Sequence, residues 1–287
     1  MTNDTLVSLL PEFIQYLKNL KRSPATILAY RADLEQLLTF LQKKEIVTHS
    51  QTKQVNIEAF RDSLLNLKYM PKTVSRKLNA IKTFFRWIAI EKKLIFNPTE
   101  KVAHPKIELT TPGFLSPLEY RALRDVVREN VRIMTMVELI LQTGLRISEV
   151  ANLKLENVTK TQITIEPYAT QLKRTIPLNK RARETFDEYQ KVRPKSNSPY
   201  VFTSKFGKPL AVRNIRAAID RYLQKAGIGQ YSVNDLRTTF FVENLKNGVD
   251  VVIVSQVAGH KRLATTEKYL KLAEMKKTGK KQILVEL

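Results

Sequence analysis

Cysteine is absent from this chain of 287 residues, and histidine occurs only 3 times. Without thiols the protein can form neither a disulfide framework nor a thiolate zinc site, and three imidazoles provide few ligands for any other metal centre. We therefore expect no metal ion and no other cofactor, and the sequence disfavours metal-dependent catalysis.

Long hydrophobic runs are also missing. The stretch around Val137 to Leu141, which Glu138 interrupts, is far short of the roughly 20 apolar residues that cross a bilayer. The first residues, MTNDTLVSLLPEF, carry no positive segment ahead of an apolar stretch and so do not resemble a secretory signal. We expect a cytoplasmic protein that does not enter a membrane.

Acidic residues are few beside the basic ones. The chain has 49 Lys and Arg against 27 Asp and Glu, a formal charge of +22 and a pI near 10.0, which is more than solubility requires. This excess predicts a polyanionic partner. A membrane surface is the weaker alternative, because the basic residues are spread through both halves of the chain instead of lying on one amphipathic helix. With 43% hydrophobic residues the chain can bury a core, and its length favours two domains.

The first hundred residues show helical spacing of apolar side chains and no strand pattern. Helices are predicted over residues 6–20, 26–42 and 57–67. A fourth begins near Pro71, because proline suits the first turn of a helix. Its hydrophobic stripe consists of Val74, Leu78, Ile81, Phe85 and Ile88.

The opposite face of this fourth helix is basic. Such a face fits a solvated surface and, in a chain of this charge, fits contact with a DNA groove equally well. The face carries Lys72, Arg76, Asn79, Lys82 and Arg86. We take its four cations as candidate DNA-binding residues and assign no base-reading role to any of them.

A polar segment rich in helix breakers follows, with Pro98, Pro105, Pro112 and Gly113. We predict a linker at residues 101–114 between a first domain, 1–100, and a second, 115–275, with a tail at 276–287. The second domain opens with a capping pattern at Ser116.

The second domain is predicted to be mainly helical with one small β-hairpin. A buried central helix covers 131–142 and ends before a glycine. TQITIEP and KRTIPL alternate as short strands with apolar inward faces, joined by a polar connection. Further helices are predicted at 180–191, 212–225, 233–246 and 251–257.

Three short motifs in this domain carry groups that act on phosphates. TGLRISE contains Arg146, NDLRTTF contains Arg237, and AGHKRLATTEKYL contains His260 and Tyr269. Guanidinium groups bind the non-bridging oxygens of a phosphodiester, an imidazole can hydrogen-bond to it, and a phenol hydroxyl can attack it. Each residue also has a structural alternative: a salt bridge of Arg146 with Glu149, a helix-packing role for Arg237, a capping histidine and a tyrosine that fills the core.

Taken together, the three motifs resemble the boxes of the tyrosine recombinase (phage integrase) family, which includes the Xer-type recombinases. The boxes occur in the family's order, with 23 positions from Arg237 to His260 and 9 from there to Tyr269. The resemblance covers residues from about 116 to 275, and the N-terminal helices are similar to the family's DNA-clamping domain.

The resemblance implies a site-specific DNA recombinase. On this resemblance we expect Tyr269 to attack a DNA phosphate, to form a 3′-phosphotyrosine and to free a 5′ hydroxyl without ATP or metal. Arg146, Arg237 and His260 hold the phosphate. It also implies a dimer on each double-stranded DNA site, a tetramer on two sites, and, from the two-domain length, an Xer-like or transposon-resolving role.

Two positions depart from the family pattern. Asn234 stands where the second box usually has a histidine, and asparagine cannot take up a proton at neutral pH, so activity is expected to be reduced. The sequence leaves open whether this asparagine is natural or engineered. The lysine that protonates the leaving oxygen is expected near Ala169, but the nearest lysine is Lys173, which is either the general acid or a solvated residue beside Arg174. We include Arg174 among the candidate DNA-binding residues.

The tail beyond Tyr269 joins a basic spacer to an apolar end. In the family a similar tail docks on the neighbouring protomer, and self-packing is the alternative. Two other functions remain open. One is an impaired DNA-binding or architectural protein with the recombinase fold, and the other is relaxation of DNA in the manner of a type IB topoisomerase.

Overall fold

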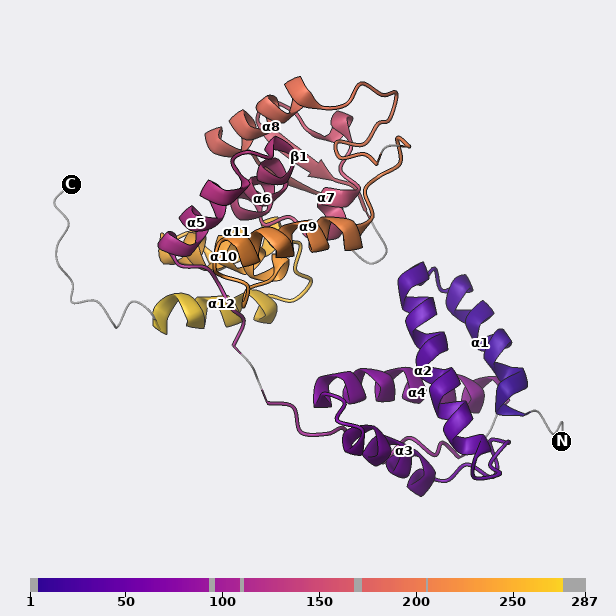
Figure 1. Ribbon diagram of the computed structural model, residues 1–287. Helices are drawn as coiled ribbons and strands as arrows, with labels where there is room; N and C mark the ends of the chain where they lie inside the picture. Colours follow the sequence, from indigo (N-terminus) through magenta and orange to yellow (C-terminus); the bar gives the residue numbers. More distant parts are fainter. Residues whose placement is uncertain (1–4, 93–95, 109–110, 168–171, 205, 276–287) are drawn as a thin grey trace. The chain divides into compact units, whose positions relative to one another are not determined.

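The computed structural model describes residues 5–92, 96–108, 111–167, 172–204 and 206–275 (Figure 1). The chain divides into two compact units, Met1–Thr110 and Thr111–Leu287. The division between them falls at residues 110 and 111, and the tail at 276–287 lies outside the described residues.

The first unit is a set of helices around one apolar core. They are α1 (Leu6–Asn19), α2 (Pro24–Gln42), α3 (Gln54–Asn66) and α4 (Pro71–Glu91). Thr5 and Ser23 cap α1 and α2 through their side-chain oxygens, and α2 and α4 each begin with a proline. These signals explain why the helices begin where they do.

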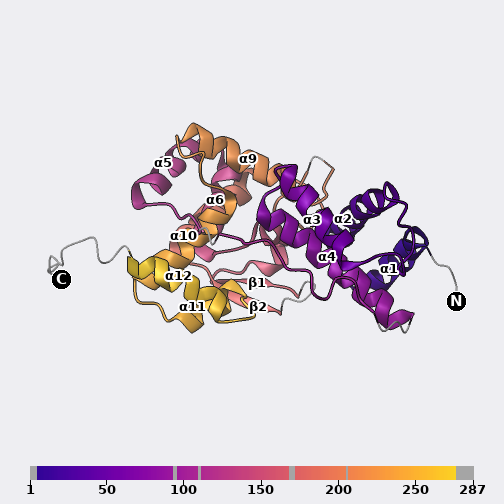
Figure 2. The ribbon, with the colours of Figure 1, turned by 90° about the horizontal axis from the view of Figure 1, so that it is seen from below.

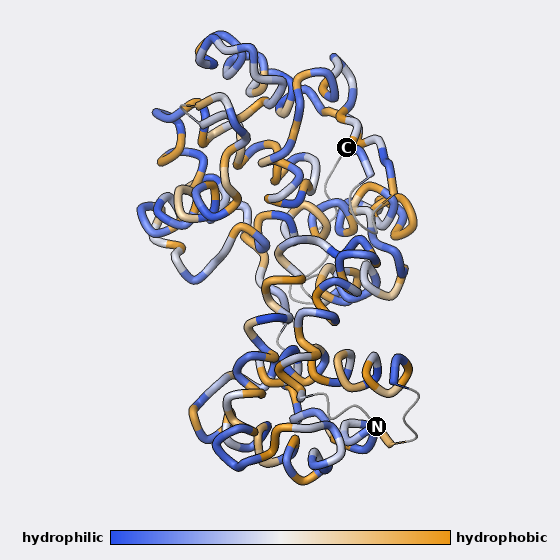
Figure 3. The backbone as a smooth tube through the Cα atoms, turned by 90° about the vertical axis from the view of Figure 1, so that its right-hand side faces the viewer, coloured by the Kyte–Doolittle hydropathy of each residue, from blue (hydrophilic) through white to orange (hydrophobic). Residues whose placement is uncertain are grey.

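Helix α4 supplies much of the first core. All five residues of its predicted hydrophobic stripe are at most 1% exposed, so the stripe is confirmed. Figure 3 shows hydrophobic and hydrophilic positions alternating along the helices, as amphipathic packing requires. The first part of the predicted linker also belongs to this core, because Val102 is 2% exposed and its carbonyl accepts a hydrogen bond from Lys82 Nζ at 2.6 Å.

The second unit is mixed. Its helices and strands are α5 (Pro117–Val127), α6 (Val131–Thr143), α7 (Ile147–Ala151), a 3-10 turn (Leu155–Asn157), β1 (Gln162–Ile165), β2 (Arg174–Pro177), α8 (Lys180–Val192), α9 (Val212–Lys225), α10 (Val233–Lys246), α11 (Val251–Ala258) and α12 (Ala264–Met275). The predicted capping box of Ser116 and Glu119 is present at the start of α5. Mainly helical structure with a small hairpin is confirmed.

Helix α6 is the central element of this unit. It packs against α8 and α10 and contacts α5, α7 and α9. It ends at Gly144, whose φ of 63° lies in the left-handed region, and a Cβ there would come within 2.5 Å of the Phe240 ring. Glycine is required at this turn, and the turn places the next residues at the end of the helix.

The β-hairpin consists of β1 and β2, which lie side by side (Figure 2). The strands pair antiparallel, with Ile163 opposite Ile176. Both isoleucines are buried, so the predicted inward face is confirmed. Strand β2 contacts α11, which brings the hairpin beside the segment before His260. Within the described ranges no helix is long and apolar enough to span a bilayer.

Candidate active site

Arg146 stands at the junction between the glycine turn that ends α6 and the short helix α7, where it is the N-cap residue. Its backbone N–H donates to Glu149 Oε2 at 2.8 Å, and its Nη1 donates to Glu149 Oε1 at 3.0 Å. Its Nη2 donates to the Gly259 carbonyl at 3.1 Å. The predicted salt bridge is present, and the same side chain also reaches the box that contains His260.

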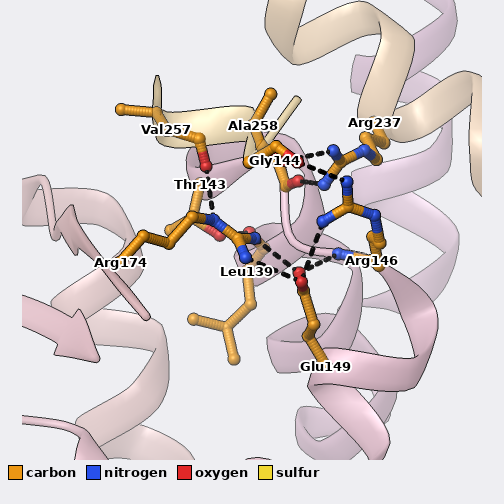
Figure 4. Close-up of polar contacts among 10 residues, drawn as sticks. Leu139, Thr143, Gly144, Arg146, Glu149, Arg174, Arg237, Val257 and Ala258 are labelled. Carbon is orange, nitrogen blue, oxygen red and sulfur yellow. Dashed lines mark hydrogen bonds and ion pairs between the residues drawn. The ribbon is translucent and has the colours of Figure 1, made fainter. Parts of the chain in front are cut away.

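Arg237 projects from α10 toward the same place. Its guanidinium donates to the carbonyl of Gly144 and, at 2.7 Å, to the carbonyl of Ala258, and it lies 4.7 Å from the centre of the Phe241 ring. The carbonyls belong to the C-terminal ends of α6 and α11, where backbone oxygens lack helical partners and carry partial negative charge. Both arginines are thus held at helix ends (Figure 4).

Arg174, the third guanidinium of this cluster, comes from the first residue of β2. It forms a bidentate pair with Glu149 at 2.8 and 2.7 Å, and its Nε donates to the Val257 carbonyl at 2.8 Å. Its side chain is only 8% exposed. Such a buried, fully paired side chain does not fit the predicted surface contact with DNA, and it ties the hairpin to α7 and α11 instead.

The cluster contains three guanidiniums and the single carboxylate of Glu149. Burial by itself would raise the pKa of Glu149, but hydrogen bonds from Arg174 and Arg146 outweigh it and lower the pKa. Burial, together with the charges of Arg146 and Arg174, lowers the pKa of Arg237 to about 9 despite the opposing charge of Glu149. Arg237 remains charged at neutral pH, and the cluster holds an excess of positive charge that a phosphate would neutralise.

His260 and Tyr269 lie next to this cluster. Helix α11 ends at Gly259, with φ 64°, and His260 follows directly. The imidazole stacks on the Tyr269 ring with centroids 6.1 Å apart, and the Phe241 ring packs against both, at 5.3 Å from His260 and 5.1 Å from Tyr269. The nucleophile predicted from the sequence is therefore partly buried beside the predicted phosphate-binding histidine.

The electrostatics of the cluster act on His260 as well. Burial, followed by the charges of Arg237, Arg146 and Arg174, lowers the pKa of His260 to about 4. The imidazole is therefore neutral at pH 7. Its Nδ1 lies 2.8 Å from the Thr266 hydroxyl.

Two predicted site residues are not held in this network. Asn234 is exposed in the first turn of α10, where its carbonyl accepts a hydrogen bond from Thr238 Oγ1 at 3.1 Å. Lys173 precedes β2 with its side chain 62% exposed, and its Nζ lies 3.4 Å from Glu166 Oε1. Ala169, where the family lysine is expected, lies outside the described residues.

The basic face of α4 lies in the first unit. Lys72 and Arg86 are exposed, whereas the Arg76 guanidinium pairs with the buried Asp33 while its side chain stays 52% exposed. Lys82 is half-buried, and its ammonium group holds the Val102 carbonyl. Among these four, Lys72 and Arg86 are thus the exposed cations that form no side-chain hydrogen bond or ion pair with the described residues.

Sequence reasoning missed that Glu149 pairs with a second arginine, Arg174, and that the Thr266 hydroxyl lies against His260. A signal for Glu149 existed, since it lies three positions after Arg146 in TGLRISE, but its second partner is 25 positions away in the hairpin. Among the described residues no group of three or more acidic or histidine side chains is placed to hold a metal ion.

Known proteins with similar sequences place the chain in a family. The phage integrase family model matches residues 114–276, and the model of the phage integrase N-terminal SAM-like domain matches residues 10–92. A tyrosine recombinase XerC of Halalkalibacterium halodurans is 30% identical over 93% of this chain and 92% of its own length. A tyrosine recombinase of Pseudothermotoga lettingae is 29% identical over 94% of this chain and 95% of its own length.

Solved structures share the fold. A lambda integrase dimer bound to a COC′ core site has a TM-score of 0.78 at 16% identity, covering 99% of this chain and 100% of that one. The Tn1549 transposon integrase in complex with transposon right end DNA also has a TM-score of 0.78, at 17% identity, with coverages of 96% and 100%. With its boxes, its two units and these relatives, the chain belongs to the phage integrase family of tyrosine recombinases.

Proposed function

We propose that this protein is a site-specific DNA recombinase that cleaves and rejoins DNA strands through a 3′-phosphotyrosine intermediate. The observation that carries the proposal is the cluster of three guanidiniums around one carboxylate, placed beside the stacked pair of His260 and Tyr269. A DNA phosphate supplies the negative charge that the cluster lacks.

The chemistry follows from these positions. The Tyr269 oxygen attacks the phosphorus, a new oxygen–phosphorus bond forms, and the bond to the 5′ oxygen breaks. Arg146 and Arg237 stabilise the charge that develops on the non-bridging oxygens, and their hydrogen bonds to helix-end carbonyls hold them in place before substrate arrives. A 5′ hydroxyl of a partner strand then reverses the step, so the bond energy is conserved.

The proton transfers involve the two residues that depart from the family pattern. Lys173 is our candidate for the acid that protonates the leaving 5′ oxygen, since its exposed side chain is free to move away from Glu166. Asn234 cannot accept the phenol proton, so this proton passes to solvent water, and the activation of Tyr269 is reduced. We expect an enzyme that is slow relative to a variant with histidine at this position.

The assembly is proposed from relatives that are bound to DNA. Related structures include a lambda integrase dimer on a core site and a lambda integrase tetramer on a Holliday junction. We infer a dimer on each site and a tetramer on two sites. Residues 1–100 serve as the DNA-clamping domain, with Lys72 and Arg86 as phosphate contacts, and residues 115–275 form the catalytic domain.

The tail at 276–287 is proposed to dock on the neighbouring protomer. A cavity of about 590 Å³ in the second unit has an apolar side formed by Leu141, Ile176, Phe240 and Ile253, among other residues. Ile253 is 52% exposed there. The apolar end of a neighbour's tail matches this surface, and deleting residues 280–287 is expected to abolish tetramers on DNA while single-site binding persists.

Covalent trapping tests the function. Duplexes that the protein binds are selected from a random-sequence pool and nicked near the site, so that the 5′ hydroxyl diffuses away after cleavage. The protein, Tyr269→Phe and Asn234→His are then compared. An SDS-resistant adduct that is lost in Tyr269→Phe and increased in Asn234→His supports the proposal.

The remaining outcomes separate the alternatives. Binding without an adduct from any of the three proteins favours an architectural role. An adduct accompanied by relaxation of supercoiled DNA without any dependence on the selected site favours a topoisomerase-like activity.

A further inference from the structure

Thr266 is a buried residue of the first turn of α12, three positions before Tyr269. Its side chain is not exposed, and its Oγ1 lies 2.8 Å from His260 Nδ1. It does not belong to the arginine cluster, and the mechanism above does not use it.

The direction of this hydrogen bond follows from the partners available. Other buried threonines of this unit, such as Thr135 and Thr239, donate their hydroxyl protons to the carbonyl four residues earlier. In the part of the chain that the structure describes, the Thr266 hydroxyl has Nδ1 of His260 as its one hydrogen-bond partner. A buried hydroxyl proton without an acceptor is unfavourable, so Thr266 donates and Nδ1 accepts.

An imidazole that accepts at Nδ1 must carry its proton on Nε2 if it is neutral. His260 is neutral at pH 7, because burial and the surrounding guanidiniums lower its pKa to about 4. The buried polar side-chain atoms without a partner in the described chain are His49 Nε2 and Gln190 Nε2. His260 Nε2 also makes no hydrogen bond there, so it is open to solvent and to a ligand.

We propose that Thr266 is a positioning residue that fixes His260 as the Nε2–H tautomer, so that the neutral imidazole donates a hydrogen bond to an oxygen of the DNA phosphate. The inference rests on the proposed function for its ligand. In the opposite tautomer the Nε2 lone pair would face an oxygen that is also an acceptor, and the contact would be repulsive.

The same hydrogen bond joins two segments of the site. Thr266 precedes Tyr269 on α12, and His260 follows the glycine that ends α11. Because the His260 and Tyr269 rings stack, a donor that orients the imidazole also sets one face against which the phenol ring packs. Thr266 thus couples the orientation of the phosphate donor to that of the nucleophile without touching the substrate.

The test compares Thr266→Val, which keeps the shape and removes the hydroxyl, with Thr266→Ser, which keeps the hydroxyl. Thr265→Val is the matched control, because Thr265 is the exposed neighbour. Long-range ¹H–¹⁵N NMR spectra at pH 7 report the tautomer of each histidine. The chain has only 3 histidines, and His260→Gln identifies the signals of His260.

We expect His260 of the unmodified protein, of Thr266→Ser and of Thr265→Val to show the Nε2–H tautomer. In Thr266→Val we expect a mixture of tautomers. On the nicked duplex, the rate of adduct formation should fall roughly 10- to 100-fold in Thr266→Val, since one phosphate donor is misoriented in part of the molecules. Thr266→Ser should keep the rate within about 3-fold, because the oriented donor remains.

The Nδ1–H tautomer in the unmodified protein, or an unchanged tautomer in Thr266→Val, would overturn the inference. So would an equal loss of rate in Thr266→Ser and Thr266→Val, because a purely structural role does not depend on the hydroxyl. If no protein forms an adduct, the proposed function fails, while the NMR spectra still decide the tautomer.

Discussion

The basic face of α4 and the arginine cluster of the second unit are both rich in cations, but they differ in burial. On α4 the side chains of Lys72 and Arg86 are exposed, and even the paired Arg76 is 52% exposed. In the cluster Arg174 is 8% exposed, and Arg237 is surrounded by backbone carbonyls and other guanidiniums.

This difference separates two uses of positive charge. Exposed cations contribute to affinity by displacing counterions from DNA, and their effect is screened by salt. Buried guanidiniums held by hydrogen bonds have a fixed geometry in a low dielectric, where they act strongly on one phosphate. The first unit is therefore expected to govern binding, and the second unit to govern rate.

The largest effect should come from Tyr269→Phe, which removes the nucleophile and leaves the ring that packs on Phe241 and His260. Adduct formation should fall by at least about 10⁴-fold, as expected when a group that reacts covalently is deleted. Affinity for the selected duplex should stay the same in a gel-shift titration. A residual adduct would point to another nucleophile.

Arg237→Ala should reduce the single-turnover rate of adduct formation by about 100- to 1,000-fold, the usual loss for one preorganised donor to a developing oxyanion. Arg237→Lys keeps the charge but loses the forked guanidinium that reaches both the Gly144 and the Ala258 carbonyl. Its rate of adduct formation should therefore lie between that of the unmodified protein and that of Arg237→Ala. Equal rates for Ala and Lys variants would show that charge alone is insufficient.

Arg174→Ala should act on stability, because it removes one partner of a buried bidentate pair. We expect the free energy of unfolding to fall by about 3 kcal/mol in urea titrations. Arg181→Ala is the control. The Arg181 side chain is 52% exposed and lies 3.5 Å from the buried Glu138, and in this variant Glu138 still pairs with Arg124. The free energy of unfolding should therefore fall by less than about 1 kcal/mol. If the stability of Arg174→Ala is unchanged and its DNA binding is weaker and less sensitive to salt, Arg174 contacts DNA as the sequence predicted.

Lys72→Ala and Arg86→Ala should each weaken binding modestly across DNA sequences. Each should lower the slope of log affinity against log salt by about 1, because each phosphate contact releases counterions. Asn79→Ala, on the same face of α4, should leave the slope unchanged. The cleavage rate at saturating protein should not change in any of these variants, and a large fall would contradict the division between binding and rate.

The smallest effect concerns pH. His260 is surrounded by Arg146, Arg174 and Arg237, with Tyr269 and Thr266 from α12, and its pKa in the folded protein is about 4. In the unfolded state the imidazole is protonated as the pH falls below about 6.5, whereas in the folded protein it stays neutral down to about pH 4. The contribution of neutral His260 to the free energy of unfolding is therefore present above pH 6.5 and is lost as the pH falls toward 4. The site is partly open, so we expect only about 1 kcal/mol.

Unfolding titrations between pH 4 and pH 7 measure this contribution. In His260→Gln the free energy of unfolding should change less with pH in that window. The lowered pKa of Glu149 contributes to the pH dependence of both proteins. A curve identical to that of the unmodified protein would mean that the pKa of His260 is the same in the folded and unfolded states.

The local elements of the fold were largely predictable. The α4 stripe, the cap at Ser116 and the hairpin with Ile163 opposite Ile176 depend on periodicity and on backbone preferences that neighbouring residues carry. The place of Val102 in the first core was not predictable in this way, because it depends on tertiary packing, and its carbonyl meets an α4 lysine 20 positions earlier.

The sequence by itself determined the family boxes and the kinds of side chain at the site, because their chemistry and order can be read along the chain. Only the tertiary structure decided how they act together. Arg146 reaches a carbonyl 113 positions away, and Arg237 reaches one 93 positions away. Every residue carries a backbone carbonyl, so no sequence pattern shows which ones lie exposed at helix ends near a guanidinium. The packing of α6, α10, α11 and the hairpin therefore brought Arg174 to Glu149 and Thr266 to His260.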